Sequence, residues 1–321
     1  MDRLRLGCAL LAWLVALGAI VAGVLAQGGR FSAKLDLLTH FAPVYVAVGL
    51  LVAVLAFLGP RGGRPALLMA SALAVAAGAA LVVPELLSRG RDPRAAIATP
   101  GQIRIVQFNA WGQNAQTDQA AAWILAQDPD VVVLQEPGRL GAELVARGYR
   151  DQTGSGGAAI LSRRSAVRTY AEPPANGHPG FISWATFRDA GGEFMVVATH
   201  RYWPVRFARE RAQTADLDRV IRGLPRERLI VAGDFNSTPW SFARRREDRA
   251  WGLIRRTRAL FTWPAARRSH NRLPAPFPWL PIDHVYAGPG WATVETVTGP
   301  ELGSDHYPVV VTLAPSVSGA R

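Results

Sequence analysis

The chain has 321 residues, a formal net charge of +12 and one cysteine, Cys8. A single cysteine excludes an intramolecular disulfide and any metal site built from several thiolates. The basic excess favours anionic partners such as phosphates, anionic lipid or nucleic acid, although nearly all of it is Arg, which codon bias alone also produces. Charges are sparse in the first hundred residues, where Ala, Leu, Val and Gly predominate, so the chain has two parts of different composition.

Three uncharged apolar stretches fill the N-terminal part. Each is long enough for a helix that crosses a hydrocarbon core of about 30 Å. None has the polar face expected of a helix in a soluble protein. We therefore predict a membrane region over residues 1–87 with three transmembrane helices. The stretches lie at 6–26, 37–58 and 66–83, and the last one extends to 87.

The basic residues that flank these stretches predict the orientation. Arg3 and Arg5 precede the first stretch, and Arg61 and Arg64 follow the second, which places both sides in the cytoplasm by the positive-inside rule. Three crossings then put the C-terminal part in the periplasm or the exterior. The protein is expected to be a multi-pass protein of the cytoplasmic (inner) membrane.

Two features of the membrane region have alternatives. The first stretch follows basic residues and ends in Val24-Leu25-Ala26, so a cleaved signal peptide is the alternative to a retained helix, with the same orientation. His40 and Glu85 are the candidates for a membrane function. A plain anchor is preferred, because Glu85 lies at a helix end, where a polar group reaches the membrane surface.

The rest of the chain predicts one α/β domain. Residues 88–100 are rich in Gly, Pro and Arg and predict a linker, the domain follows at 101–315, and a disordered tail is expected at 316–321. Short β-rich apolar runs alternate there with two amphipathic segments. We expect strands at 103–108, 131–134, 158–161, 181–187, 194–199, 229–232, 282–286, 292–297 and 307–313, and helices at 117–127 and 207–221.

Polar residues stand at the ends of many of these strands. An isolated Asp at a strand end is usually a turn former. Six positions that all carry Asp, Glu, Asn or His are better explained by a functional site, because sites are commonly built on loops at one edge of a packed sheet. The positions are Asn109, Glu136, His200, Asp234 with Asn236, Asp283, and Asp305 with His306.

The motifs around these residues resemble the endonuclease/exonuclease/phosphatase (EEP) superfamily, in the same order along the chain. The resemblance covers 102–313, and the apolar stretches indicate its membrane-anchored VanJ-like branch. Segments 157–163 and 261–264 are also similar to members of the family. The motifs are IVQFNAW at 105–111, VLQE at 133–136, ATH at 198–200, AGDFN at 232–236, IDHV at 282–285 and SDH at 304–306.

The resemblance implies a fold, an activity and a cofactor. The fold is a four-layer αββα sandwich (DNase I-like), here preceded by the three transmembrane helices. The activity is hydrolysis of phosphate esters with Mg²⁺, for which Mn²⁺ is an alternative. Asn109, Glu136 and Asp305 are the expected metal ligands, since carboxylate and amide oxygens suit Mg²⁺. The single cysteine and the few histidines argue against a dedicated zinc site.

The expected catalytic residues are His200, Asp234, Asn236, Asp283 and His306. Asp234 would orient or deprotonate the attacking water, and Asn236 and His200 would donate to phosphoryl oxygens. In the family, Asp283 fixes the tautomer of His306 and raises its basicity. The sequence leaves open whether Asp234 or His306 is the general base.

Several basic and aromatic residues are candidate substrate contacts, namely Arg201, Arg206 and Trp263. The segment 244–272 contains ten Arg with Trp and Phe interleaved. It is compatible with nucleic-acid binding, with anionic lipid headgroups, or with a solvated helix and loop. Tethering to a membrane favours lipid among these partners.

The leading hypothesis is a membrane-anchored, metal-dependent phosphoesterase, either a phosphatase or a phosphodiesterase, at the outer face of the membrane. Its substrate would be a phosphate ester such as a lipid phosphate or a polyprenyl diphosphate. The alternatives are an extracytoplasmic Mg²⁺-dependent endonuclease or exonuclease, which would bind nucleic acid, and a catalytically inactive membrane scaffold. Retention of eight polar site positions disfavours the scaffold. No sequence feature indicates a protein partner.

Overall fold

The structure is a computed structural model that describes residues 2–59, 61–154, 156–173, 180–265 and 277–316. The chain divides into two compact units. The helical unit comprises Met1–Ser88 together with Thr238–Arg246, and the sandwich unit comprises Arg89–Ser237 and Glu247–Arg321. The domain that the sequence predicts at 101–315 includes Thr238–Arg246, a segment whose contacts lie mainly with the helical unit.

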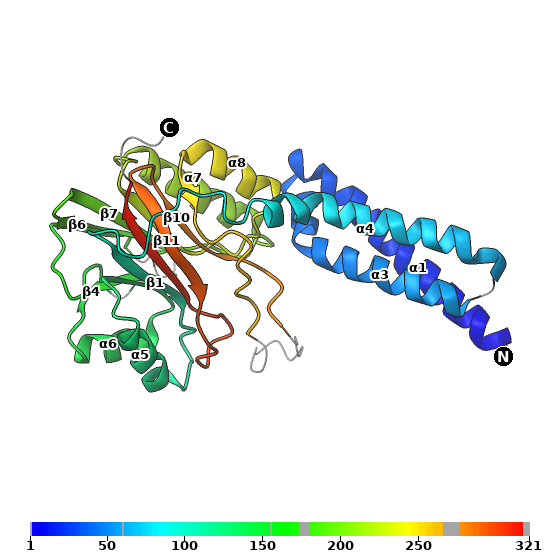
Figure 1. The fold of residues 1–321 in the computed structure, drawn as a ribbon, viewed down its shortest axis with the longest axis horizontal. Helices are drawn as coiled ribbons and strands as arrows, with labels where there is room; N and C mark the ends of the chain where they lie inside the picture. The colour runs from blue at the N-terminus through cyan, green and yellow to red at the C-terminus, as the bar shows by residue number, and fades with distance from the viewer. Residues whose placement is uncertain (1, 60, 155, 174–179, 266–276, 317–321) are drawn as a thin grey trace. The chain divides into compact units, whose positions relative to one another are not determined.

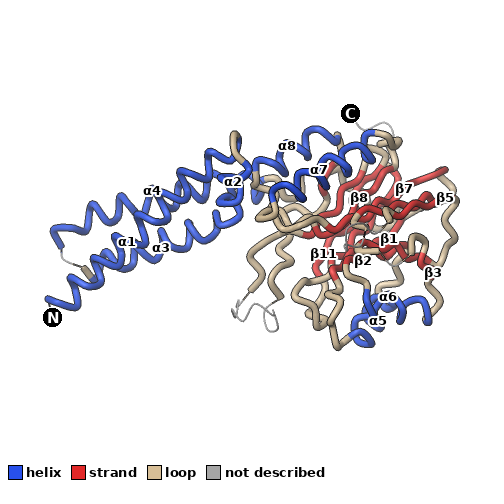
Figure 2. Tube along the Cα trace, turned by 180° about the vertical axis from the view of Figure 1, so that it is seen from behind, coloured by secondary structure: helices blue, strands red, loops and turns tan. Residues whose placement is uncertain are grey.

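The helical unit is built on three long helices that lie side by side (Figures 1 and 2). Each is long and apolar enough to cross a membrane, in agreement with the three predicted stretches. Short helical turns join them. The helices are α1 (Asp2–Gln27), α3 (Ala42–Leu58) and α4 (Arg64–Leu87), and the turns are η1 (Gly28–Arg30), α2 (Ala33–Asp36), η2 (Leu37–Phe41) and η3 (Arg61–Gly63).

Small residues line the contacts between these helices. A Cβ on Gly78 would lie 2.5 Å from the carbonyl oxygen of Ala42, so only glycine allows α3 and α4 to approach this closely. The Ser71 hydroxyl of α4 donates to the Gly49 carbonyl of α3 at 2.7 Å. Large apolar side chains point outward instead, which is the arrangement expected of helices surrounded by lipid. Among them are Leu10, Leu14, Leu50, Val54, Met69 and Leu73.

The sandwich unit contains two six-stranded sheets. Each sheet is mixed, because β1 runs parallel to β2 and β7 runs parallel to β8 while the other neighbours are antiparallel. The first sheet has the order β11 (Trp291–Thr298), β12 (Val309–Pro315), β1 (Ile103–Asn109), β2 (Val131–Gln135), β4 (Ala158–Ser162), β3 (Arg150–Asp151). The second has the order β5 (Arg168–Ala171), β6 (Ile182–Asp189), β7 (Gly192–His200), β8 (Leu229–Asp234), β10 (Asp283–Ala287), β9 (Ile254–Arg255).

Alternating side chains stack these elements into four layers (Figure 1). Ile103 and Ile105 of β1 join the core between the two sheets, whereas Val106 and Phe108 face the outer core under two helices. On the other outer face, Leu217 packs with strands of the second sheet. The predicted DNase I-like αββα sandwich is therefore confirmed. Its helices are α5 (Thr117–Ala126) and α6 (Gly138–Ala146) on the first sheet, and α7 (Phe207–Arg222) on the second.

Two segments add to the elements of the sandwich. The segment predicted as a linker is joined to the sheet, because Ala95 donates to the Thr293 carbonyl at 2.9 Å and Thr293 donates to the Pro93 carbonyl at 2.7 Å. A further helix, α8 (Phe242–Trp251), occupies the start of the basic segment. Its first five residues belong to the helical unit and the rest to the sandwich unit.

Candidate active site

The strand ends predicted to carry the site meet at one edge of the sandwich. Register explains why, because the parallel pair β7 and β8 ends with His200 beside Asp234, and the antiparallel pair β8 and β10 sets Asp283 opposite Asp234. In the first sheet, Asn109 at the end of β1 pairs with Gln135, the residue before Glu136. Chain-distant residues are thus brought together by strand pairing.

Asp234 is the centre of a buried hydrogen-bond network. Its side chain is 1% exposed and accepts three bonds within the sandwich unit. The Asn109 amide donates to Oδ2 at 3.0 Å, the backbone N–H of Asn236 donates to Oδ1 at 2.8 Å, and the Asn236 amide donates to Oδ2 at 3.3 Å. These bonds fix the rotamer of Asp234 and leave its orientation independent of substrate.

Asp283 and His306 form the expected pair. His306 Nδ1 lies 2.8 Å from Asp283 Oδ2, and the other carboxylate oxygen accepts a bond from Gln107 at 2.9 Å. His306 Nε2 lies 3.7 Å from Asp234 Oδ2, which is too long for a direct hydrogen bond but short enough for strong electrostatic coupling. The imidazole therefore stands between two buried carboxylates.

This arrangement changes the protonation of both groups. Burial raises the pKa of Asp234 to about 6, the Asp283 carboxylate adds to that rise, and His306 and His200 oppose it. Burial alone would lower the pKa of His306, but the carboxylates of Asp283 and Asp234 outweigh it, and the pKa is raised to about 10. Near neutral pH, His306 is consequently a cation that donates, and Asp234 is the group that accepts a proton.

His200 and Glu136 border this network on its more exposed side. His200 Nε2 lies 3.8 Å from Asp234 Oδ2 and 3.9 Å from Glu136 Oε1. Glu136 has a left-handed backbone with φ of 49°, a conformation that costs free energy in residues other than glycine and is often found at functional sites. Gly112 N–H donates to Glu136 Oε2 at 3.1 Å, so the carboxylate is oriented although it is 39% exposed.

The donor set suits a hard divalent cation. Glu136 presents a partly exposed carboxylate. The side-chain oxygen Oδ1 of Asn109 accepts a bond from the Trp111 N–H at 3.1 Å and keeps a second lone pair. Asp234, Asp283 and His306 also offer ligand atoms that all lie within 4.8 Å of one another. The predicted ligands Asn109 and Glu136 fit Mg²⁺ by donor type, whereas the Asp-Asp-His group could hold a cation only with His306 in its neutral form.

Asp305 connects the site to a group of tryptophans. The Trp263 indole N–H donates to Asp305 Oδ2 at 3.2 Å, and the Ala265 N–H donates to the Asp305 carbonyl at 2.7 Å. Trp263 contacts Trp203 with ring centroids 5.5 Å apart and Trp279 at 6.4 Å. Trp203 is 43% exposed. The predicted substrate contact Trp263 thus belongs to an aromatic group that borders the site and reaches solvent.

The geometry does not support the predicted substrate contact of Arg201. Its side chain is 1% exposed and makes ion pairs with Glu210 and Glu247, and it also contacts Thr214. A buried guanidinium group that is paired in this way has a structural role and is not exposed to a substrate. Arg201, which follows His200 directly, instead links the end of β7 to α7 through Glu210 and to α8 through Glu247. Arg206 lies over the ring of Tyr202 at 5.8 Å, close to the loop that carries Trp203.

Several residues of the basic segment 244–272 are buried, although its composition suggested an exposed binding surface. Arg255 and Arg256 are buried, and Arg256 donates to the Trp291 carbonyl at 2.7 Å and to the Thr293 hydroxyl at 3.2 Å. Trp251 is fully buried in the core beside α7. Arg255, Arg256 and Trp251 therefore have structural roles, and the segment is not a uniform binding patch. The portion at 266–276 lies outside the described residues.

Two further residues, Gln107 and Ser304, support the site and were not assigned a role from sequence. Gln107 Nε2 donates to both Asp283 and Gln135, the latter at 2.7 Å. The Ser304 hydroxyl donates to the Asn109 carbonyl at 2.7 Å and accepts from the His306 N–H at 3.1 Å. The available signal was the presence of polar residues within fully buried strands or beside Asp-His, because buried polar groups require partners.

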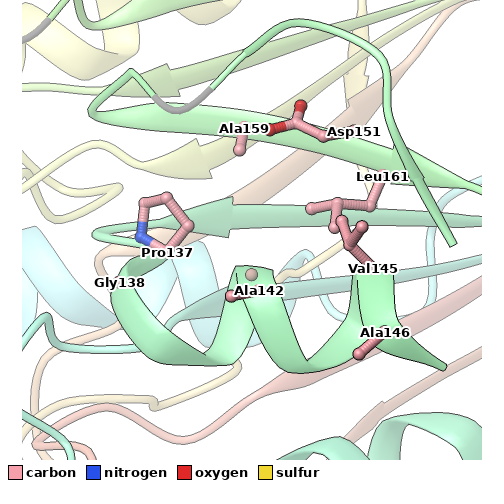
Figure 3. Close-up of a pocket in the computed structure, with 9 residues that line it drawn as sticks. Pro137, Gly138, Ala142, Val145, Ala146, Asp151, Ala159 and Leu161 are labelled. Atoms are coloured by element: carbon pink, nitrogen blue, oxygen red, sulfur yellow. The ribbon is translucent and has the colours of Figure 1, made fainter.

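The residues that directly follow Glu136 help to line a separate cavity. It has a volume of about 390 Å³ and lies between α6 and the strands β3 and β4 (Figure 3). Its lining is mostly apolar, with Pro137, Ala142, Val145 and Leu161, and Asp151 as an acid. A negatively charged group in an apolar lining does not attract phosphate, so this cavity is not part of the phosphate site.

Comparison with known proteins gives the same family as the motifs. The profile of the Endonuclease/Exonuclease/phosphatase family matches residues 106–306, which include every predicted site residue. No curated protein matches the chain. Similar solved structures include endonuclease/exonuclease/phosphatase proteins from Beutenbergia cavernae and Bacteroides vulgatus, and the endonuclease domain of TRAS1, a telomere-specific non-LTR retrotransposon.

These structures are similar to this chain in fold. The Beutenbergia protein is 22% identical with a TM-score of 0.51, and the alignment covers 67% of this chain and 72% of that one. The Bacteroides protein is 21% identical with a TM-score of 0.51, covering 67% and 99%. The TRAS1 domain is 17% identical with a TM-score of 0.50, covering 67% and 99%. Because the family profile spans more than half of the chain and its whole site, the protein belongs to the Endonuclease/Exonuclease/phosphatase family, whose members hydrolyse phosphate esters.

Proposed function

We propose that this protein is a membrane-anchored, metal-dependent phosphoesterase that acts on the phosphate ester of an amphiphilic membrane substrate, such as a lipid phosphate or a polyprenyl diphosphate. The observation that carries the proposal is the attachment of the Asp234, Asp283 and His306 site to three apolar helices within one chain. We place it in the VanJ-like branch of the family, in the cytoplasmic membrane with the site on the outer side.

The roles follow from charge and hydrogen bonding. Asp234 accepts the proton of the attacking water, since it is the group whose pKa lies just below neutrality. His306 is cationic and donates to the phosphoryl group or the leaving oxygen, and Asp283 stabilises that cation at 2.8 Å. His200 and Asn236 add donors to the developing negative charge. The question of the general base, open in the sequence, is answered in this proposal by Asp234.

A divalent cation completes the proposal. Mg²⁺, or Mn²⁺, would be held by Glu136 and Asn109 with Asp305 as a further carboxylate, and it would neutralise charge on the phosphoryl oxygens. The chain's own contribution is to orient these donors before substrate arrives. Gly112 does this for Glu136, and Trp263 does it for Asp305.

The aromatic group favours an amphiphilic substrate. Trp203, which contacts Trp263, and the exposed residues Val205 and Phe277 give the sandwich unit apolar side chains that reach solvent. Trp is suited to membrane interfaces because its ring is apolar and its N–H is polar. Nucleic acid remains the alternative substrate, because aromatic rings also stack on bases.

The test uses the full chain in lipid nanodiscs that contain a lipid phosphate, with plasmid and single-stranded DNA as competing substrates. We expect Mg²⁺-dependent release of phosphate from the lipid, abolished by EDTA and by D234A. The control D216A removes an exposed acid on α7 and should retain activity. E136Q should raise the Mg²⁺ concentration for half-activity by about tenfold or more, as loss of one carboxylate ligand weakens hard-cation binding.

Two results would contradict the proposal. DNA cleavage that D234A abolishes, without lipid-phosphate turnover, would establish the nuclease alternative. Absence of hydrolysis of lipid phosphates, DNA and generic phosphodiesters with either Mg²⁺ or Mn²⁺ would establish the inactive scaffold.

A further inference from the structure

Asp36 and His40 are buried ionisable side chains of the helical unit that have no part in the proposed chemistry. Asp36 is 5% exposed at the end of α2, and His40 is 8% exposed in η2. Both lie at the start of the second span, 33–58. Burial of a carboxylate or an imidazole is costly unless specific partners compensate for lost water, and ionisable groups in membrane segments commonly serve a function. Their partners therefore indicate what they do.

Asp36 holds the first turn of α8. Its Oδ1 accepts from the Phe242 N–H and its Oδ2 accepts from the Ala243 N–H, each at 2.8 Å. The first N–H groups of a helix have no partner within the helix, and a carboxylate there is stabilised by the helix dipole. The Ser241 hydroxyl accepts from the third N–H, that of Arg244, at 3.1 Å. Asp36 thus supplies from α2 a cap that local sequence provides only in part.

His40 holds the start of the same segment. Its Nδ1 lies 2.7 Å from the Thr238 hydroxyl and 3.3 Å from the Thr238 N–H, and Thr238 is fully buried. The far end is held too, because the Arg245 guanidinium donates to the Leu81 carbonyl of α4 at 2.7 Å. The nine residues Thr238–Arg246 are consequently fixed within the helical unit at both ends.

The residues that flank this segment belong to the catalytic network. Asn236, two positions before Thr238, binds Asp234 through both its backbone and its side chain. Its φ of 47° is the left-handed conformation, which the local structure must hold in place. Ser237 is fixed by His284, whose Nε2 lies 2.9 Å from its carbonyl oxygen. Motion of Thr238 is therefore transmitted to Asn236 through one intervening residue.

Glu247, on the C-terminal side of this segment, is also linked to Asn236. Glu247 follows Arg246 directly and accepts from Arg201 Nη1 at 2.8 Å. The carbonyl of Arg201 in turn accepts from the Asn236 side chain at 2.8 Å. Both ends of Thr238–Arg246 thus lead to Asn236, one through the chain and one through the Glu247–Arg201 pair.

We propose that Asp36 and His40 are positioning residues. They hold Thr238–Arg246 within the helical unit, and the chain that continues from this segment into Ser237 carries that constraint to Asn236, which binds Asp234. The membrane helices then do more than retain the enzyme at its substrate. This inference rests on the proposed phosphoesterase function, and it makes the activity of the sandwich unit dependent on the helical unit.

The test compares T238V with T238S in the full chain in nanodiscs. Valine matches threonine in shape and lacks the hydroxyl that meets His40, whereas serine keeps it. We expect T238V to lower kcat by about tenfold or more, since misplacement of reacting groups by about 1 Å costs up to about 100-fold, and T238S to restore it. KM and the Mg²⁺ requirement should change by less than about twofold, because Thr238 contacts neither substrate nor metal.

A second variant and a second readout separate positioning from general stability. D36A removes the cap of α8 and should increase hydrogen exchange in peptides that cover 235–247, with a loss of kcat at least equal to that of T238V. The control S71A removes another buried hydrogen bond of the helical unit, to the Gly49 carbonyl, and should leave both exchange at 235–247 and kcat unchanged.

The outcomes distinguish the two proposals. A wild-type chain that hydrolyses no phosphate ester overturns the proposed function. If the wild type is active and both T238V and D36A have the same kcat as the wild type, only the present inference is overturned, even if hydrogen exchange at 235–247 rises. Loss of kcat in S71A as large as in D36A would likewise overturn it, because the effect would then reflect the stability of the bundle.

Discussion

At the level of single residues, the charge of the site is set by one histidine between two buried carboxylates. Asp283 lies 2.8 Å from His306, and Asp234 lies 3.7 Å from it on the other ring nitrogen. Removal of water strengthens these interactions, because the local dielectric constant is lower than that of bulk solvent. The consequence is a proton-accepting carboxylate beside a proton-donating imidazolium, which is the separation of roles that acid–base catalysis requires.

This arrangement predicts the pH dependence of hydrolysis. Asp234 must be ionised, so kcat/KM should fall as pH drops through the raised pKa of about 6. His306 must be protonated, so kcat/KM should fall as pH rises through about 10. D283N removes a negative charge that raises both pKa values, and both limbs should therefore move to lower pH.

The measurement is kcat/KM across the pH range at fixed, saturating Mg²⁺ for wild type and D283N. A bound cation shifts the limbs of both proteins in the same direction, so the comparison depends on the difference between them. The apparent values belong to the coupled groups together. A D283N profile with unchanged limbs, or with a limb moved to higher pH, would contradict the assigned protonation states.

At the level of elements, the site depends on the close pairing of β7 and β8. Gly233 precedes Asp234, and a Cβ at this position would lie 1.9 Å from the Thr199 carbonyl oxygen of β7. The nearest obstacle is the backbone of Thr199, which cannot move aside as a flexible side chain does. Glycine is therefore required here by the approach of two strands, and Asp234 and His200 are positioned by the same pairing.

We predict that G233A separates the ends of β7 and β8 and moves Asp234 away from His200. Hydrolysis should fall by about 100-fold, and stability should fall by about 1–3 kcal/mol, the usual cost of overpacking. The matched control is G223A after α7, where a Cβ would meet its nearest atoms at 3.5 Å, an ordinary contact. Thermal inactivation and kcat in nanodiscs measure both effects, and a G233A as active as G223A would refute the argument.

The elements also show how far sequence reasoning extends. β2 was predictable because Val131–Leu134 is apolar on both faces, and the Asp283–His306 pair because its motifs are short and specific to a family. For the segment that contains α8, a solvated helix and loop was only one of three alternatives, and the start of the helix was not predictable because its cap comes from Asp36, far away in sequence. The role of Gln107 also required the second sheet, where it meets Asp283. What sequence missed depends on contacts between chain-distant residues.

At the level of the whole molecule, the helical unit has the surface of a membrane protein. Small residues such as Gly49 and Gly78 face its interior, and leucines and valines face outward. A soluble protein rarely exposes so many large apolar side chains together. Three crossings would put the two ends of this unit on opposite sides of a membrane, and basic residues before the first span predict a cytoplasmic N-terminus.

The single cysteine makes this orientation testable by labelling. In a Cys8→Ser background, Gly62→Cys places a thiol in the exposed turn between α3 and α4, and Asp118→Cys places one on α5, where the native side chain is 79% exposed. A membrane-impermeant maleimide added to intact cells or spheroplasts should label D118C and spare G62C, which reacts only after lysis. This result is expected because the positive charge of Arg61 and Arg64 predicts a cytoplasmic position for that turn. Labelling of G62C before lysis, with D118C protected, would place the active site in the cytoplasm and remove outer-leaflet lipid phosphates as substrates.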